Sequence, residues 1–291
     1  MGIDDTNPAE DSNERMTGYV VSPAWLAGHL DDPQVKIIET PWKRDGYDRA
    51  HIEGARCLPW HPYLKAEEDG NRSLHVLGEA EFVDLMQSLG IRKGDDVIAY
   101  DEFHNLFSTR FWWVCRLYGF DNVRVLDGGW QRWVELGLPV SIRVPEIEES
   151  TGFPVEARRD YLIRLDELEA FLGREDLQIW DTRRTTEYNG SEQTSNRRRG
   201  HLPGAVNLEW KLVLEEEAYP GGSRVLRSPA KIEQMLQRLG LEKDKLTVTH
   251  CQAGIRAAFG SFVLEMLGYS RVRCYDASMA EWANLDHTEL V

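Results

Sequence analysis

Long apolar segments are absent from this sequence. The first residues, from Met1 to Arg15, are polar and acidic and hold no apolar stretch like that of a signal peptide. No run of about 18 apolar residues occurs further along, so we expect no transmembrane span and no membrane partner. We expect 1–17 to form a disordered tail. The start also fits the short pattern for N-myristoylation, but two acidic residues follow closely, so we expect no lipid anchor.

Positive charge is scarce relative to negative charge. The 291 residues include 34 Lys and Arg but 49 Asp and Glu, which gives a formal net charge of −15. Nucleic-acid-binding proteins need a clustered basic face for the phosphates, so we expect no nucleic-acid partner. An anionic substrate would have to be attracted by a local positive site against the overall field.

Cysteine is also scarce. The four cysteines, Cys57, Cys115, Cys251 and Cys274, show no zinc-ligand spacing, and a secreted protein held by disulfides would carry a denser set. We therefore expect a reducing, cytoplasmic location, no bound metal and free thiols. Three of the four lie in apolar, core-like segments and are expected to be buried and inert. The surroundings of Cys251 differ from these.

The sequence contains two copies of one pattern. Three blocks of the first half recur in the second half, in the same order and at nearly the same offset. Leu89-Gly90-Ile91 recurs at Leu239-Gly240-Leu241 (239 − 89 = 150), Ala50–Ala55 at Gly200–Ala205 (200 − 50 = 150), and Gly119–Asp127 at Gly268–Asp276 (268 − 119 = 149). A period of about 150 residues is too long for a solenoid repeat, so each copy is a whole domain. We place the first domain at 18–140, an exposed linker without chemistry of its own at 141–157, and the second domain at 158–291.

Short apolar runs alternate with longer helical patterns in both copies. Buried strands are predicted at Val35–Glu39, Asp96–Tyr100, Asn122–Leu126, Leu177–Asp181, Leu246–His250 and Arg271–Tyr275. Helices are predicted at Glu79–Leu89, Thr109–Leu117, Pro229–Leu239 and Ile255–Leu267. This alternation predicts an α/β fold in which each domain is a parallel β-sheet flanked by α-helices on both faces. Functional residues are then expected at the carboxyl ends of the strands.

The turn that joins two of these elements carries the candidate chemistry. An apolar strand ends at His250, an apolar helix begins near Ile255, and between them Cys251 opens a short turn that includes Gly254 and ends at Arg256. Such a turn can direct backbone N–H groups at the sulfur and form an anion nest at a helix N-terminus. This positive environment favours the thiolate, which is the nucleophilic form. Gly254 permits the positive φ of a tight turn, and Arg256 adds a cation suited to an oxyanion.

The sequence resembles the rhodanese family of sulfurtransferases from about Val20 to Trp282, nearly the whole chain. The family's active-site loop begins with cysteine, spans six residues and often ends in arginine, as does the segment from Cys251 to Arg256. Further similar motifs are Asp127-Gly128-Gly129-Trp130, Gly200 to Asn207 and Asp181-Thr182-Arg183. The resemblance implies two tandem rhodanese-like domains.

The resemblance also implies a sulfurtransferase that works by double displacement. Cys251 would take a sulfane sulfur from a small anionic donor, hold it as a persulfide stabilised by the loop amides, and pass it to cyanide or a thiol. The residues expected to bind the substrate are Gln252, Ala253, Gly254, Ile255, Arg256 and Arg183. The resemblance implies no metal and no organic cofactor.

The first copy lacks the reactive residues. Asp101 stands where Cys251 stands in the second copy (251 − 101 = 150), and the segment from Asp101 to Asn105 has no thiol, no glycine and an added negative charge. Such a loop cannot form a persulfide. Tandem members of the family pair an inactive first domain with an active second one, which implies a structural role for the first domain.

Thiosulfate and 3-mercaptopyruvate compete as sulfur donors. Family members that use thiosulfate commonly have basic residues right after the cysteine, where Gln252 and Ala253 are neutral. Members that use mercaptopyruvate typically have Gly-Ser-Gly there, and Ala253 replaces the serine of their proposed relay. Arg256 supplies positive charge, which favours thiosulfate, although Glu187 occupies a position where the family has a substrate-contacting arginine. The cluster Arg197–Arg199 fits an anion-attracting patch and a solvated loop equally well.

Other interpretations fit parts of the pattern. Phosphatases related to this fold use a longer loop, Cys-x5-Arg, whereas Cys251 to Arg256 is Cys-x4-Arg and is sized for a sulfur atom. A non-catalytic sulfur-binding or interaction module would use the same loop without turnover. A buried cysteine at a strand end can also be inert. The junction of strand, thiol, glycine and arginine favours a thiosulfate sulfurtransferase over all three.

Overall fold

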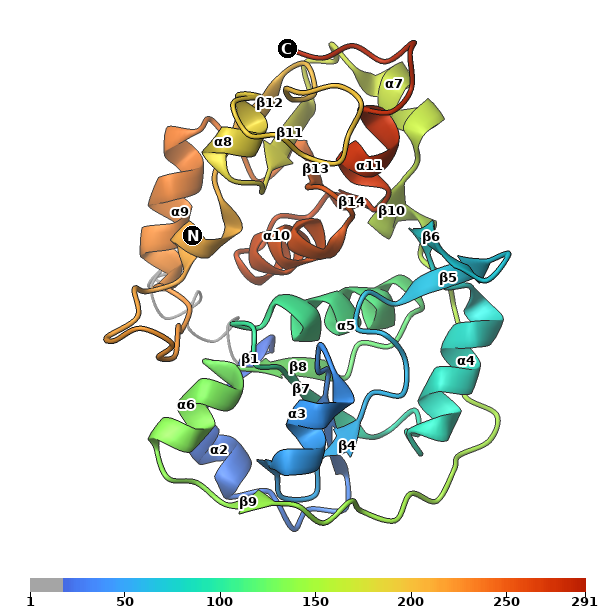
Figure 1. Ribbon diagram of the computed structural model, residues 1–291, viewed down its shortest axis with the longest axis vertical. Coiled ribbons are helices and arrows are strands. Elements are labelled where there is room, and N and C mark those ends of the chain that lie inside the picture. Colours follow the sequence, from blue (N-terminus) through green and yellow to red (C-terminus); the bar gives the residue numbers. More distant parts are fainter. Residues whose placement is uncertain (1–17) are drawn as a thin grey trace, which may run out of the picture.

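The computed structural model describes residues 18–291, and the tail predicted for 1–17 lies outside this range. The chain folds into two α/β domains that lie against each other (Figure 1). The first domain, coloured blue to green, occupies the lower half of the view, and the second, coloured yellow to red, occupies the upper half. Two helices of the two halves, α5 (Leu106–Leu117) and α10 (Ile255–Met266), lie side by side where the domains meet.

Each domain is built on a five-stranded parallel sheet. The first sheet has the order β1 (Val20–Val21), β8 (Val123–Leu126), β7 (Asp96–Tyr100), β2 (Val35–Glu39) and β4 (Arg56–Cys57). The second has the order β10 (Leu162–Ile163), β14 (Val272–Tyr275), β13 (Leu246–His250), β11 (Leu177–Asp181) and β12 (Ala205–Asn207). The two orders correspond strand for strand, which confirms the duplicated α/β architecture predicted from the sequence.

Helices cover both faces of each sheet, as predicted. The first domain adds α2 (Pro23–Ala27), α3 (Arg44–Arg49), α4 (Glu79–Ser88) and α6 (Gly129–Glu135), and the second adds α7 (Leu165–Phe171), α8 (Thr185–Tyr188), α9 (Pro229–Arg238) and α11 (Ser278–Trp282). Alternate residues of a strand point to opposite faces. Ile98 of β7 therefore clusters with Leu26, Tyr47 and Trp133 from α2, α3 and α6, whereas its neighbour Ala99 belongs to the cluster that contains α5.

Short elements complete the two domains. The antiparallel pairs are β3 (His51–Ile52) with β9 (Val140–Ser141) and β5 (Lys65–Glu68) with β6 (Asn71–Val76), and the 3-10 turns are Arg159–Tyr161 and Trp210–Val213. No helix within residues 18–291 is long and apolar enough to cross a membrane. The hairpin of β5 and β6 projects from the first domain toward the second (Figure 1).

The predicted strands and helices agree with the structure to within one residue, except at the start of α5. The apolar periodicity predicts a start at Thr109, whereas the helix begins at Leu106. The Asp101 carboxylate accepts the N–H groups of Phe107 and Ser108 at 2.9 and 2.8 Å, which satisfies donors of the first turn. The spacing of apolar residues cannot show that a side chain before the helix, here that of Asp101, caps its first turn.

The packing of α5 against α10 joins the domains through one hydrophobic core. A single cluster of buried side chains includes Trp112 of α5 and both Ala258 and Phe262 of α10. The rings of Trp112 and Phe262 meet edge to face, with centroids 5.0 Å apart. At the edge of this cluster, Arg116 Nη2 lies 3.4 Å from Glu265 Oε2. The two domains therefore share buried surface.

The linker follows the first domain closely. Ser141, the first residue of the linker, pairs with His51 in the β3–β9 ladder. Ser150 donates a side-chain hydrogen bond to the carbonyl of Ile91 at 2.6 Å, and Phe153, 6% exposed, meets the ring of Phe82 edge to face at 5.9 Å. The linker is largely exposed chain, but Ser150 and Phe153 are buried against the first domain.

Truncation of Trp112 tests whether the two domains share one core. We expect Trp112→Ala to lower the free energy of unfolding by about 3–5 kcal/mol, because this large side chain is 1% exposed. Urea denaturation followed by circular dichroism measures the loss. Trp42→Ala, at a tryptophan that is 38% exposed, is the matched control and should cost about 1 kcal/mol or less. Equal losses in the two variants would contradict a shared core.

Candidate active site

The turn from β13 to α10 runs between His250 and Ile255, at the carboxyl edge of the second sheet. Cys251 in this turn is 1% exposed, and its Sγ accepts a hydrogen bond from the backbone N–H of Gly254 at 3.1 Å. Gly254 is the N-cap residue of α10 and has a φ of 86°, which glycine adopts without strain. The sulfur therefore lies at a helix N-terminus, where the backbone favours an anion. Among the described residues one backbone N–H donates to the sulfur, whereas the sequence suggested several.

A second turn, between β14 and α11, holds the cysteine loop. The Cys251 N–H donates to Ser278 Oγ at 3.0 Å. The Cys251 carbonyl accepts the N–H of Met279 at 3.1 Å, and the Gln252 carbonyl accepts the N–H of Ala280 at 2.8 Å. These hydrogen bonds fix the backbone of the first two loop residues.

Arg256 ends the loop with its guanidinium paired to a carboxylate. Its two terminal nitrogens lie 2.6 and 2.9 Å from the two carboxylate oxygens of Glu187. Burial acts to raise the pKa of Glu187, but Arg256 overcomes this effect and lowers the pKa to about 2. Burial acts to lower the pKa of Arg256, but the hydrogen bonds and the charge of Glu187 act in the opposite direction, and the pKa lies above its ordinary value. Arg256 is thus at the site, and Glu187 balances most of its charge.

The second residue of the loop is tied to a neighbouring segment. The side-chain amides of Gln252 and Asn196 exchange two hydrogen bonds, at 3.0 and 2.7 Å, and Asn284 donates to Asn196 Oδ1 at 3.4 Å. Ala253 is half-buried and Ile255 is buried. No group of three His, Cys, Asp or Glu side chains within residues 18–291 is arranged to hold a metal ion. Backbone amides and Arg256 are therefore the polar groups that the loop offers to a ligand.

Arg183 lies inside the second domain. Its side chain is 1% exposed, and its Nη2 lies 2.6 Å from Asp181 Oδ2. The same nitrogen donates to the carbonyl of Gly200 at 2.9 Å. A buried guanidinium needs such partners for its charge and its N–H groups. The structure thus places Arg183 in a buried ion pair rather than in the substrate-facing position expected from the sequence.

The cluster Arg197–Arg199 mainly fastens the C-terminal segment. Arg198 donates to the carbonyls of Thr288 and Trp282 at 2.6 and 3.0 Å. Arg197 pairs with Asp286 at 3.0 Å. Arg199 is exposed. Two of the three arginines therefore have structural partners.

His250 precedes the cysteine and is completely buried. Both ring nitrogens lack a hydrogen-bond partner within the described residues, and Nε2 lies 3.5 Å from Asp181 Oδ2. Burial lowers the pKa of His250 to about 4, although Asp181 acts in the opposite direction. His250 is therefore neutral near pH 7 and adds no charge beside the sulfur.

The equivalent turn of the first domain holds a carboxylate in place of the sulfur. Asp101 is completely buried. Its two oxygens accept the N–H groups of Phe103, Asn105, Phe107 and Ser108 at 2.6, 3.0, 2.9 and 2.8 Å. The duplicated turn can thus direct several amides at one anion. The sequence predicted the added negative charge, but not that these amides would surround it.

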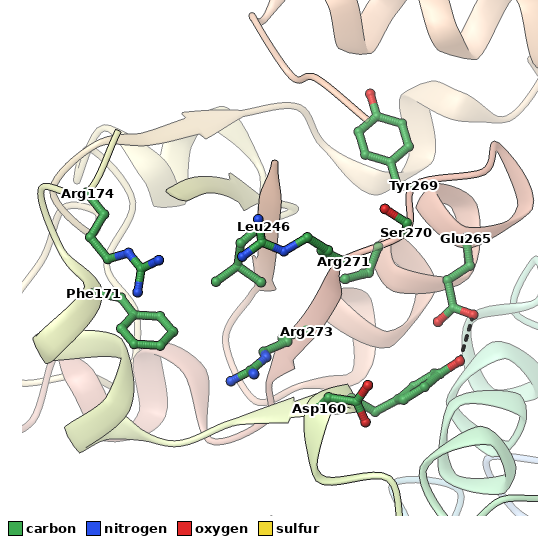
Figure 2. A pocket seen from close by; sticks show the side chains of 11 residues that line it. Asp160, Phe171, Arg174, Leu246, Glu265, Tyr269, Ser270, Arg271 and Arg273 are labelled. Atoms are coloured by element: carbon green, nitrogen blue, oxygen red, sulfur yellow. Dashed lines mark hydrogen bonds between the residues drawn. The ribbon is translucent and has the colours of Figure 1, made fainter. Parts of the chain in front are cut away.

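A cavity of about 330 Å³ lies at the opposite edge of the second sheet (Figure 2). Three arginines, Arg174, Arg271 and Arg273, line it near the starts of β13 and β14. Arg174 and Arg271 pair with Asp176, and Arg273 pairs with Glu167. Because its arginines are paired and it lies at the amino ends of the strands, this cavity is not the catalytic site.

Several residues of the site are missing from the sequence prediction. Ser278 supports the loop, Asn196 holds Gln252, and Glu187 was noted only as a missing arginine. Asn196 lies 56 residues from its partner Gln252, and Glu187 lies 69 residues from Arg256. The periodicity of apolar residues within one helix or strand cannot predict contacts between residues so far apart in the sequence. The one available signal is the repeat, which aligns the turn before Ser278 with the Asp-Gly-Gly-Trp motif of the first copy.

The burial of His250 predicts a loss of stability in acid. Its pKa is about 4 in the folded protein and 6.5 ordinarily, so in this interval the unfolded chain binds a proton and the folded chain does not. This stabilisation is complete above pH 6.5 and is lost toward pH 4, by about 3 kcal/mol. We expect His250→Gln to remove this part of the pH dependence in a series of urea denaturations. Parallel curves of unfolding free energy against pH for the two proteins would contradict the prediction.

Known proteins resemble this chain along most of its length. The rhodanese-like domain model matches residues 22–136 and, a second time, 164–285. The thiosulfate sulfurtransferase of Corynebacterium glutamicum is 34% identical over 277 residues, which cover 91% of this chain and 88% of the relative. The sulfur carrier protein TtuD of Thermus thermophilus is 31% identical over 284 residues, which cover 91% and 94%. The crystal structure of SseA from Escherichia coli, described as a 3-mercaptopyruvate sulfotransferase, has a TM-score of 0.74 and 26% identity and covers 89% of this chain and 98% of that chain.

These comparisons extend over both halves of the chain. The family model matches once in each domain, so the two copies seen in the sequence and in the sheets are two copies of one family domain. The full-length relatives contain the same tandem arrangement over most of their own length. The chain therefore belongs to the rhodanese family, as a tandem-domain sulfurtransferase of the thiosulfate/3-mercaptopyruvate type.

Proposed function

We propose that this protein transfers a sulfane sulfur from thiosulfate to cyanide or a thiol through a persulfide on Cys251. The observation that carries the proposal is the hydrogen bond from the Gly254 N–H to Cys251 Sγ at 3.1 Å, at the N-terminus of α10. A thiolate or a persulfide at this point gains from a charge-assisted hydrogen bond and from the helix dipole.

The first domain indicates how a persulfide would be held. A carboxylate oxygen of Asp101 is two bonds beyond Cβ, and the outer sulfur of a persulfide is also two bonds beyond Cβ. The Asp101 carboxylate accepts hydrogen bonds from four backbone N–H groups of its turn. The equivalent turn of the second domain presents the amides of Arg256 and Ala257, which belong to the first turn of α10 and have no acceptor within the helix. We expect the outer sulfur to lie toward these amides.

The reaction consists of two displacements. In the first, the Cys251 thiolate attacks the outer sulfur of thiosulfate, the S–S bond of thiosulfate breaks, and sulfite leaves with the electron pair. In the second, cyanide or a thiolate attacks the outer sulfur of the persulfide, and the Cys251 thiolate leaves. The products are thiocyanate or a new persulfide, and the sum needs no added oxidant or reductant.

Thiosulfate is the donor that we favour over 3-mercaptopyruvate. Ala253 leaves the loop without the serine of mercaptopyruvate users. Arg256 places a cation at the end of the loop, five residues after Cys251 (256 − 251 = 5). Relatives named thiosulfate sulfurtransferase or putative thiosulfate sulfurtransferase are 34% and 30% identical over 91% of this chain.

A sulfur carrier is the second candidate function. Glu187 balances the charge of Arg256 through two hydrogen bonds, which weakens the attraction of the loop for a thiosulfate dianion. The relative named sulfur carrier protein is 31% identical over 284 residues. A carrier would form the same persulfide on Cys251, would turn thiosulfate over slowly, and would give its sulfur to a protein acceptor.

Mass spectrometry tests the persulfide directly. After incubation with thiosulfate, we expect the intact protein to gain the mass of one sulfur atom, mapped to Cys251. Thiocyanate formation from thiosulfate and cyanide should fall by about 10³-fold or more in Cys251→Ser, because the nucleophile is lost. Cys57→Ser, which removes the partly exposed thiol of the first domain, is the control and should keep its activity. Hydrolysis of p-nitrophenyl phosphate without thiocyanate formation would refute the proposal in favour of a phosphatase.

Release of Arg256 from its partner tests whether Arg256 attracts the donor. We expect Glu187→Gln to lower the KM for thiosulfate by about tenfold, equivalent to about 1.4 kcal/mol, because Arg256 regains an unbalanced charge. Glu192→Gln is the matched control, since this carboxylate pairs with Arg184 at the surface. Steady-state kinetics of both variants measure the effect. A KM that stays the same or rises in Glu187→Gln would show that Arg256 does not attract the donor.

A further inference from the structure

A buried charge cluster joins the first domain to the cysteine loop of the second. Asp276 follows β14, and its Oδ1 lies 2.9 Å from Lys65 Nζ and 2.7 Å from Arg110 Nη1. None of these three side chains is more than 2% exposed. Lys65 belongs to β5 and Arg110 to α5, so both cations come from the domain that has no thiol in its loop.

Asp276 is in direct contact with the glycine of the cysteine loop. A Cβ atom on Gly254 would lie 2.2 Å from Asp276 Oδ1 and 2.5 Å from the Asp276 carbonyl oxygen, so only glycine permits this approach. Lys65 Nζ also donates to that carbonyl oxygen at 3.2 Å. The N–H of the same glycine donates to Cys251 Sγ. A shift of Asp276 would therefore shift the hydrogen-bond donor of the sulfur.

The cluster carries more positive than negative charge. Two cations share one carboxylate, and within residues 18–291 neither Arg110 Nη2 nor Asp276 Oδ2 has a hydrogen-bond partner. Burial lowers the pKa of Lys65 below its ordinary value, although the charge of Asp276 acts in the opposite direction. Charges in a water-free interior are screened weakly. The unbalanced positive charge therefore favours an anion in the adjoining loop.

The duplicated half provides an internal comparison. Asp127 is the first-copy equivalent of Asp276 (276 − 127 = 149), and Phe259 stands at the equivalent of Arg110 (259 − 110 = 149). Leu214 stands at the equivalent of Lys65, because its bridge to Leu226 matches the pairing of Lys65 with Val76. Neither of these two positions in the second domain holds a cation.

The pKa values of the two aspartates shift in opposite directions for this reason. Asp127 accepts a backbone N–H from Leu226 at 3.1 Å and forms no ion pair in the described part of the chain, and burial raises its pKa to about 6. Burial also acts to raise the pKa of Asp276, but Arg110 and Lys65 overcome it and lower the pKa below its usual value. The same position therefore has a carboxyl group with a lowered pKa in the second copy and with a raised pKa in the first.

We propose that Lys65 and Arg110 of the first domain are positioning residues for sulfur transfer at Cys251. Through Asp276 they hold Gly254 against the cysteine, and they place positive charge behind the loop. The first domain thus takes part in the reaction without a nucleophile of its own. This inference rests on the proposed persulfide function and deepens it.

Alkylation of Cys251 in the full-length protein tests the role of Lys65. In Lys65→Met, we expect the rate constant for iodoacetamide at neutral pH to fall about tenfold, because the loop donor and a nearby cation no longer favour the thiolate. The ratio of the rate constants for iodoacetate and iodoacetamide should fall as well, because the anionic reagent loses the attraction of the buried cation. A merely structural defect would reduce the fraction of protein that reacts, but would not change this ratio.

Arg116→Met is the matched control for this experiment. It also removes an interdomain cation, but its partner Glu265 lies about 15 Å along α10 from the loop. The control should react as the wild type does. If Lys65→Met does not fold, Lys65→Gln keeps a polar side chain in the same place and replaces it in the comparison.

Two outcomes separate this inference from the function on which it rests. A folded Lys65 variant whose rate constants and reagent ratio stay within about twofold of the wild type would overturn the positioning role. A wild-type protein that gains no sulfur from thiosulfate would refute the proposed function instead. The alkylation comparison needs no sulfur donor, so it decides the role of Lys65 in either case.

Discussion

The contact between α5 and α10 is the constraint on which the rest of the molecule depends. It merges the interiors of two domains into one hydrophobic cluster, in which Trp112 and Phe262 exclude water from the boundary. Arg110 lies two residues before Trp112 on α5, so the same packing brings its guanidinium to Asp276. An ion pair between the domains would be weak in water, but here the hydrophobic contact keeps it buried and oriented.

Two copies of one backbone have taken different roles at a single turn. In the first copy a carboxylate fills the nest of amides and caps α5, and in the second copy a sulfur lies at the start of α10. The strand orders of the two sheets are the same, so the fold alone does not distinguish the copies. The difference comes from Asp101 and Cys251, and from Lys65 and Arg110, which reach across the boundary.

Local patterns predicted the sheets, most helix limits and the cysteine turn. Apolar runs such as Val35–Glu39 and Leu246–His250 are strands in the structure with the same limits. Contacts between distant segments could not be predicted in this way, because Lys65 and Arg110 lie 211 and 166 residues from Asp276. Arg183 illustrates a different failure: the Asp-x-Arg motif is local, but Asp181 occupies its guanidinium within the core. The motif therefore predicted where the candidate site lies. Which of its charged side chains can reach a ligand depends on their burial, which the sequence pattern does not give.

The cap formed by Asp101 also makes a reactive cysteine hard to introduce into the first copy. Four backbone amides donate to that carboxylate, so a cysteine at this position would leave most of them without an acceptor. Asn105 stands where the working loop has glycine, and Asp127 lacks the cations of its counterpart. Each substitution toward the residues of the second-domain loop would therefore lower the stability of the first domain before it made the turn reactive. The folding of the first domain thus depends on a carboxylate at the position where the second domain has its thiol.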